Sequence, residues 1–238
     1  MSEKQRTPGW VWAAFGCIFA AFAAAVFFVV VFVFGARKVR EFEADLKDPV
    51  SREERVLEVL GADAMPDGFY PMVGFSLPFV FDMAMMTTTP PDESGEMAEG
   101  LGDEAFIYFK MLGRATQEEE LYDFFEGKTN DPTVLRRQNI SVNVRKLLDR
   151  GVIERDDTTV LWVVNEGTFG MGGGSARDGL ATLMLFQCPG QKRLRMGIWM
   201  APGPEAPAEG EELELTGTAG DPAEIEALVA GFRPCPTG

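Results

Sequence analysis

The sequence contains no histidine, so it lacks the side chain that most often serves as a general base near neutral pH and that most often binds zinc. Only three cysteines occur in 238 residues, and no two of them have the Cys-x-x-Cys spacing of common zinc sites. The acidic segment 92–104 lacks the calcium-loop spacing with its central glycine. We therefore predict no catalytic residues, no metal ligands and no cofactor.

Basic residues are also scarce, and their distribution along the chain is uneven. The whole chain has a formal net charge of −15, whereas residues 1–49 carry six Lys or Arg and five Asp or Glu. Residues 50–238 therefore hold a net charge of −16. A segment this acidic is repelled by nucleic acids and by anionic lipid surfaces, which excludes nucleic acid as a partner.

What the sequence does contain is a long apolar run. Residues 10–34 include no charged side chain. As a helix they would measure about 37 Å, against a bilayer hydrocarbon core of about 30 Å. Nine apolar residues follow the small residues at 23–25, so the segment is expected to remain as an anchor rather than to be cleaved as a signal peptide. We predict a tail at residues 1–9, a transmembrane anchor at 10–36 and bilayer contact through 10–34.

Small residues recur every fourth position within this anchor, at Gly16, Ala20 and Ala24. That spacing lets two membrane helices approach closely, and it predicts a packing face. An alanine-rich segment also produces such spacing by chance, so self-association and a monomeric tether both remain open.

Signals in the sequence disagree about the orientation of the anchor in the membrane. Two basic residues precede it and four follow between 37 and 47, which favours a cytoplasmic domain by the positive-inside rule. Against this, the short basic tail resembles the leader of a signal anchor. Cys188 and Cys235 form an even pair that an oxidising compartment would allow to close as a disulfide. We favour a cell-membrane protein with an extracytoplasmic domain.

After the anchor, the pattern predicts a helical stalk at residues 37–61 and a soluble acidic domain at 66–236. Residues 51–54 read as a capping box that starts the second stalk helix, and Gly61 ends it. Large apolar side chains then alternate with smaller residues from Val73 to Met86, which predicts one long strand with its large face buried. Pro78 makes this strand an edge or bulged strand, and Asp82 on its small-residue face is expected to be exposed.

The rest of the chain alternates between strand and helix signals. Strands are expected at 105–112, 152–155, 159–165, 180–187 and 193–200, and helices from Thr116, after Asp131 and from Asp221. Residues 140–144, in the stretch that follows Asp131, alternate in character, so a strand there is an open alternative to helix. The fold class is therefore α+β: one transmembrane helix, a helical stalk, and a mostly antiparallel sheet with flanking helices. An arrangement in two loosely repeated halves is an open alternative.

Two segments invite a chemical interpretation. Cys188 is a candidate nucleophile but has no histidine to activate it, so a disulfide half is the simpler reading. Backbone amides of a glycine-rich stretch can cradle an anion, but this one lacks the phosphate-loop pattern and precedes a predicted strand where a helix would be needed, so a flexible hairpin connection is the favoured interpretation. The residues concerned are Gly172, Gly173, Gly174, Ser175 and Arg177.

These observations predict a single-pass, membrane-anchored acidic domain that is non-catalytic and takes part in protein interaction or in an envelope complex. Its partners would be the lipid bilayer and either another protein or a second copy. The alternatives are a membrane-tethered hydrolase or transferase that uses carboxylates, and a domain that binds a small apolar ligand or lipid.

Overall fold

The computed structural model describes residues 48–77, 80–92, 102–112, 115–137, 142–155, 157–169, 177–191, 193–204 and 213–235. The predicted tail, the transmembrane anchor with its packing face at Gly16, Ala20 and Ala24, and residues 37–47 of the stalk lie outside these ranges. Among the helices of the described ranges, none has the length and apolar character needed to cross a bilayer.

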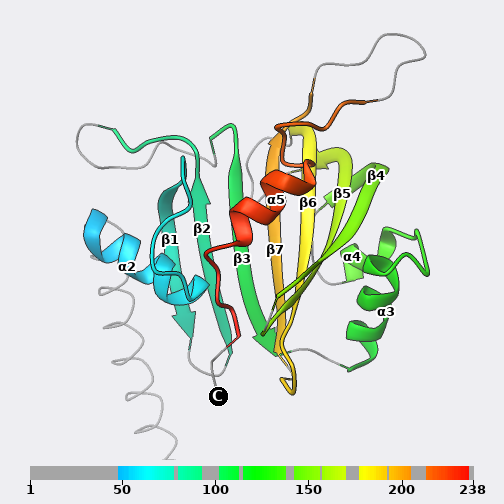
Figure 1. Ribbon diagram of the computed structural model, residues 1–238, viewed down its shortest axis with the longest axis horizontal. Helices are drawn as coiled ribbons and strands as arrows, with labels where there is room; N and C mark the ends of the chain where they lie inside the picture. The colour runs from blue at the N-terminus through cyan, green and yellow to red at the C-terminus, as the bar shows by residue number, and fades with distance from the viewer. Residues whose placement is uncertain are drawn as a thin grey trace, which may run out of the picture. The chain divides into compact units, whose positions relative to one another are not determined.

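The domain is built on a seven-stranded antiparallel sheet, so the expected α+β class with a mostly antiparallel sheet is confirmed (Figure 1). The strand order is β1-β2-β3-β7-β6-β5-β4, in which two consecutive meanders meet where β3 pairs with β7. The strands are β1 (Tyr70–Leu77), β2 (Phe81–Thr87), β3 (Ala105–Leu112), β4 (Val142–Glu154), β5 (Thr159–Phe169), β6 (Arg177–Gln187) and β7 (Arg193–Pro202).

Helices pack on both faces of the sheet. Alternate strand residues point to opposite faces, so each face has its own apolar core. The first core joins α2 (Pro49–Leu60) and α5 (Pro222–Val229) to residues such as Trp162 of β5. The second joins α3 (Ala115–Phe125) and α4 (Thr133–Arg137) to residues such as Val163.

The α2 helix starts earlier than the sequence indicates. Asp48 is its N-cap, and the Asp48 carboxylate accepts hydrogen bonds from the Ser51 backbone N–H at 3.2 Å and from the Ser51 hydroxyl at 2.5 Å. Pro49 then takes the first helical position, where its missing N–H costs nothing. Gly61 ends the helix in the left-handed conformation with φ of 65°. Val56 and Leu60 are fully buried, so α2 belongs to the first core.

The single long strand expected from Val73 onward is wrong: this segment forms two antiparallel strands, β1 and β2. The Val80 N–H donates to the Leu77 carbonyl at 3.0 Å in the turn that joins them. The expected burial is also reversed. Gly74, Asp82 and Ala84, on the small-residue face, are buried. Small side chains let α2 approach the strands on that face, whereas the large side chains of the other face are only partly buried.

Gly74 tests this close approach. A Cβ atom there would lie 2.5 Å from the Arg55 carbonyl carbon and 2.6 Å from the Val56 nitrogen, both in the α2 backbone. We expect Gly74→Ala to lower the free energy of unfolding by about 2 kcal/mol or more, since a helix backbone cannot yield as a side chain can. Urea unfolding measures the change.

Gly231 provides the matched control for that variant. No atom lies within 4 Å of a Cβ built there, and its φ is outside the left-handed region. Gly231→Ala should therefore leave the unfolding free energy within about 0.5 kcal/mol of wild type. Equal effects of the two substitutions would show that α2 does not constrain position 74.

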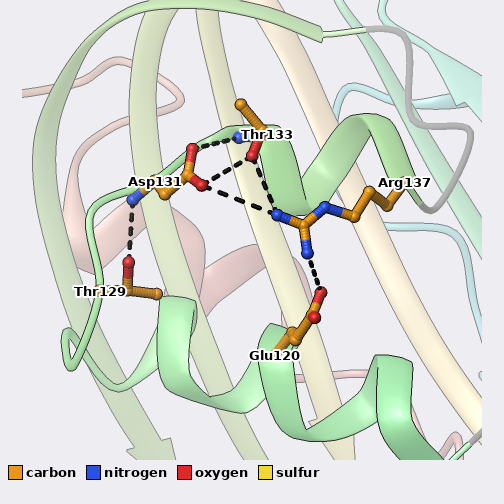
Figure 2. A network of polar contacts seen from close by, with 5 residues as sticks. All are labelled: Glu120, Thr129, Asp131, Thr133 and Arg137. Atoms are coloured by element: carbon orange, nitrogen blue, oxygen red, sulfur yellow. Dashed lines mark hydrogen bonds and ion pairs between the residues drawn. The ribbon is translucent and has the colours of Figure 1, made fainter.

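A polar network fastens the short α4 helix to α3 (Figure 2). The Asp131 carboxylate accepts from the Thr133 backbone N–H at 3.0 Å and from its hydroxyl at 2.7 Å, which lowers the pKa of Asp131. Arg137 reaches back to Glu120 of α3, with 2.7 Å between Nη1 and Oε2. The helix predicted after Asp131 is present, but it ends at Arg137.

The C-terminal segment 230–235, here called the strap, crosses the first core after α5. Phe232 is buried against Phe106, with ring centroids 5.4 Å apart. The backbone N–H of Arg233 donates to the Leu60 carbonyl at 3.3 Å, and Cys235 at the end of the strap is in a disulfide with Cys188. The strap therefore connects the end of α2 to the turn between β6 and β7.

Candidate functional site

A cleft of about 640 Å³ opens beside α5 at one end of the first core. It is bounded by the loop before β1, the ends of β2 and β7, the start of β3, and α5 with the turn that precedes it. Its lining includes the aromatic residues Phe69 and Trp199 and three carboxylates. Those carboxylates belong to Asp67, Glu104 and Glu224.

Glu104 is the most constrained of these carboxylates. Its backbone carbonyl accepts hydrogen bonds from the Thr87 hydroxyl at 2.8 Å and from the Thr88 N–H at 3.2 Å, at the end of β2. Its side chain accepts from the Trp199 indole N–H at 2.7 Å. Partial burial, together with the nearby negative charge of Glu224, raises the pKa of Glu104 although the indole hydrogen bond opposes this.

Contacts with Phe69 and Glu104 fix the position of Trp199 in the aromatic wall of the cleft. The ring of Phe69 meets Trp199 edge to face, with centroids 6.2 Å apart and planes at 64°. Trp199 is 5% exposed, and its indole is fixed on one side by Glu104. The cleft therefore combines a preorganised carboxylate with a rigid aromatic surface.

A buried polar cluster also lies on the first core's face of the sheet. Asp82 of β2 is 7% exposed, forms an ion pair with Lys110 of β3, and accepts from the Ser76 hydroxyl at 2.5 Å. Arg193 of β7 lies 4.0 Å from the same carboxylate. Burial raises the pKa of Asp82, but the hydrogen bonds and positive charges outweigh burial and lower it overall. Asp82 is therefore buried, and the expectation that its side chain is exposed is wrong.

Next to Asp82, the Arg195 guanidinium is almost fully buried. Its Nε–H donates to the Pro234 carbonyl of the strap at 3.1 Å, and Nη1 donates to the Arg193 carbonyl at 3.1 Å. Its Nη2 contacts the Gln191 side-chain oxygen. Burial lowers the pKa of Arg195, and these hydrogen-bond acceptors compensate the guanidinium for its lost contact with water. The cluster thus joins four strands, β1, β2, β3 and β7, to the strap.

The opposite face of β1 and β2 carries a partly exposed apolar surface. We define it by Val73, Phe75, Leu77, Phe81, Met83 and Met85, which pair across the two strands as Val73 with Met85, Phe75 with Met83 and Leu77 with Phe81. Among the described residues, no member of β1 or β2 belongs to the second core. Leu77 is 43% exposed. This apolar surface extends to the edge of the sheet at β1.

The two edges of the sheet differ in character. The outer strand β4 carries five charged residues and two register shifts, both of which hinder the addition of another strand. The outer strand β1, with the sequence YPMVGFSL, contains no charge, and its proline and its one register shift both lie near the start of the strand, before Val73. The edge at β1 is therefore the one suited to pairing with a further strand.

The structure describes some, but not all, of the candidate site residues identified from the sequence. Cys188 and Cys235 are joined in a disulfide with 5.5 Å between their Cα atoms, so Cys188 holds no free thiol. Arg177 begins β6 and pairs in register with Phe169. The other members of the glycine-rich loop, Gly172, Gly173, Gly174 and Ser175, lie outside the described residues.

The sequence did not point to the cleft. Glu104 stands at the end of an acidic segment in which no one carboxylate differs from the next, and Trp199 lies 95 positions farther along the chain. Only the pairing of β3 with β7 brings them together. The one local signal is the position of Glu104, the second of two adjacent acidic residues, directly before a strongly apolar strand.

A scan against models of protein families finds no match to this chain, and a search of curated proteins finds none either.

Proposed function

We propose that this chain is a single-pass membrane protein whose acidic α+β domain is a non-catalytic interaction domain that assembles with a second copy through β1. The observation that carries the proposal is the apolar surface, which reaches an uncharged edge strand. Burial of such a surface is a favourable driving force for association, and β1, as the end strand of the sheet in the described part of the chain, supplies backbone groups for pairing.

A second copy is the occupant that best fits this edge. Two β1 strands related by a two-fold axis run antiparallel, so pairing would continue both the sheet and the apolar surface across the junction. Each domain is strongly acidic, yet the six residues of the apolar surface carry no charge. Contact there would avoid placing like charges against each other. The predicted packing face at Gly16, Ala20 and Ala24 would bring two anchors together.

The disulfide supports an extracytoplasmic domain. Disulfides persist in oxidising compartments and are rare in the cytosol, where thiols are kept reduced. The Cys188–Cys235 bond closes a separation of 47 residues and holds the strap on the core. In this proposal the anchor holds the domain at the outer surface of a cell membrane, and β1 joins two such domains.

Cross-linking at the two sheet edges tests the assembly. In a Cys17→Ser background, Val73→Cys in the middle of β1 and Val152→Cys on β4 each add one thiol at an apolar position on an outer strand that is not fully buried. In native membranes we expect a short bismaleimide to cross-link Val73→Cys into a dimer, with a yield about five-fold or more above that of Val152→Cys, since antiparallel pairing about a two-fold axis near the middle of β1 brings the two copies of residue 73 together in strands about 5 Å apart.

The yield ratio distinguishes the modes of assembly. Equal dimer yields at both positions would mean that the anchors alone associate, which contradicts pairing through β1. A cross-linked product of a different mass would identify a different protein as the occupant. A monomer in both variants would contradict assembly altogether.

A further inference from the structure

The cleft beside α5 is negatively charged, and among the described residues that line it no basic side chain balances that charge. Its lining includes three carboxylates, and no Lys or Arg is found among the described residues that form it. Asp67 and Glu224 are exposed, while Glu104 is partly buried behind the indole of Trp199. Like charges that line one concave site raise the free energy of the empty site, and a bound cation lowers it.

A metal ion does not suit this arrangement. Within the described ranges, no three His, Cys, Asp or Glu side chains are close enough together to hold one. The cleft of about 640 Å³ is also much larger than a coordinated ion. The cleft therefore has room for an organic cation, whose charged head needs fewer carboxylate partners than a metal ion and whose remaining atoms occupy the rest of the space.

The aromatic and apolar residues that line the rest of the cleft suit an organic cation with an apolar hydrocarbon stem. Trp199 and Phe69 present aromatic rings at the Glu104 side, and a positive group near an indole or phenyl ring is stabilised by the ring quadrupole. The other walls include short apolar side chains and one leucine. These are Pro66, Ala201, Pro202, Pro204, Ala219, Ala227 and Leu228.

We infer that the cleft binds an alkylammonium group, with its charged head against the carboxylates of Glu104 and Glu224 and its apolar stem along Ala227 and Leu228. The head would come either from a free amine or from a lysine side chain of a polypeptide. Assembly through β1 is not required, because the cleft lies beside α5 on the α2 side of the sheet.

The indole of Trp199 supplies a direct readout. The chain has four tryptophans, so full-length protein labelled with ¹⁵N-tryptophan in micelles gives four indole signals, and Trp199→Phe identifies the one at the cleft. We expect n-pentylamine to shift the Trp199 signal saturably. The signal of Trp162, which lies in the first core and does not line the cleft, should not shift.

Two glutamates on α5 test whether pentylamine binds at a specific site or is only attracted in general to an acidic protein. Glu224 lines the cleft, whereas Glu226 is exposed on the same helix and does not. Glu224→Gln should weaken pentylamine binding about ten-fold, since it removes a charged partner, while Glu226→Gln makes the same charge change and should leave binding within about two-fold. Glu104→Gln, which retains an acceptor for Trp199, should also weaken binding about ten-fold.

Matched probes identify the chemistry that is recognised. Ammonium chloride lacks the stem and n-pentanol lacks the charge, so both should bind far more weakly than pentylamine. Nα-acetyl-lysine methylamide tests the polypeptide source: binding comparable to pentylamine assigns the lysine side chain, and weaker binding assigns a free amine. An equal response to pentanol, an equal response to ammonium, or equal effects of Glu224→Gln and Glu226→Gln would each overturn the inference. Because none of these depends on dimer formation, failure here leaves the role of β1 intact.

Discussion

Asp82→Asn is expected to lower the free energy of unfolding by about 3 kcal/mol, because removing one partner of a buried ion pair leaves the other charge uncompensated. Asparagine preserves the shape of the side chain and can still accept from Ser76. It cannot neutralise the Lys110 ammonium, which is only 23% exposed, or the neighbouring Arg193. Urea unfolding of the full-length chain at neutral pH measures the loss.

Asp63 supplies the matched surface control. Its carboxylate lies 3.0 Å from Arg233 Nη2, but its side chain is 81% exposed. Because exposed pairs contribute little, Asp63→Asn should cost less than about 1 kcal/mol. Equal losses in the two variants would contradict a special role for the buried cluster. Replacing the pair together, as Asp82→Leu with Lys110→Met, should recover part of the stability, since the Lys110 ammonium is then no longer left without its partner, although Arg193 and Arg195 keep their charges.

The pH dependence of this difference has a definite sign. The pKa of Asp82 is lowered in the folded state, so the unfolded state takes up the proton first as pH falls. The stabilisation by the Asp82 carboxylate is therefore complete above the unfolded pKa and disappears as pH falls through the folded pKa. Wild type and Asp82→Asn should converge in stability at strongly acidic pH. A constant difference down to that pH would contradict the ion-pair explanation.

Local signals in the sequence predicted the elements whose causes are local. Asp221 followed by Pro222 indicated the start of α5, and the Asp221 carboxylate accepts from the Ala223 N–H at 2.9 Å. The alternating pattern in β7 placed Leu194, Met196 and Ile198 on one face, where they join the second core. Capping and side-chain periodicity depend on neighbouring residues, so one sequence is enough to identify them.

The faces of β1 and β2 required information that no local pattern contains. Alternation of large and small residues shows that a strand has two different faces, but a neighbouring element decides which of them is covered. Here α2 covers the face with Gly74 and Ala84, whose small side chains permit its close approach. The larger face is left partly exposed, against the ordinary expectation that large apolar residues are innermost.

The cleft was out of reach for a related reason. Its carboxylates, Asp67, Glu104 and Glu224, are far apart in the sequence, and only the strand order together with the packing of α5 on the sheet places them around one cleft. The pairing of β3 with β7 could not be inferred from patterns within either strand. The pairing of Cys188 with Cys235, in contrast, was open to prediction because only two cysteines lie outside the apolar run.

Replacing both Cys188 and Cys235 by serine should lower the free energy of unfolding by about 4 kcal/mol, since the disulfide closes a loop of nearly fifty residues and restricts the unfolded chain. The loss should reach or exceed this value. With the strap released, the buried Arg195 guanidinium would lose the Pro234 carbonyl, which accepts from its Nε–H, and a buried donor without an acceptor costs further free energy.

Urea unfolding of three full-length proteins separates this effect from a general sensitivity to loss of cysteine. Cys17→Ser removes the cysteine within the apolar run and should unfold like wild type, whereas the double variant should unfold at a much lower urea concentration. Reduction of the wild type should reproduce the double variant, because both release the strap, and should leave the double variant unchanged. A double variant within about 1 kcal/mol of wild type would mean that Phe232 and the backbone contacts of Arg233 hold the strap without the disulfide. The oxidising compartment would then no longer be needed for a stable fold.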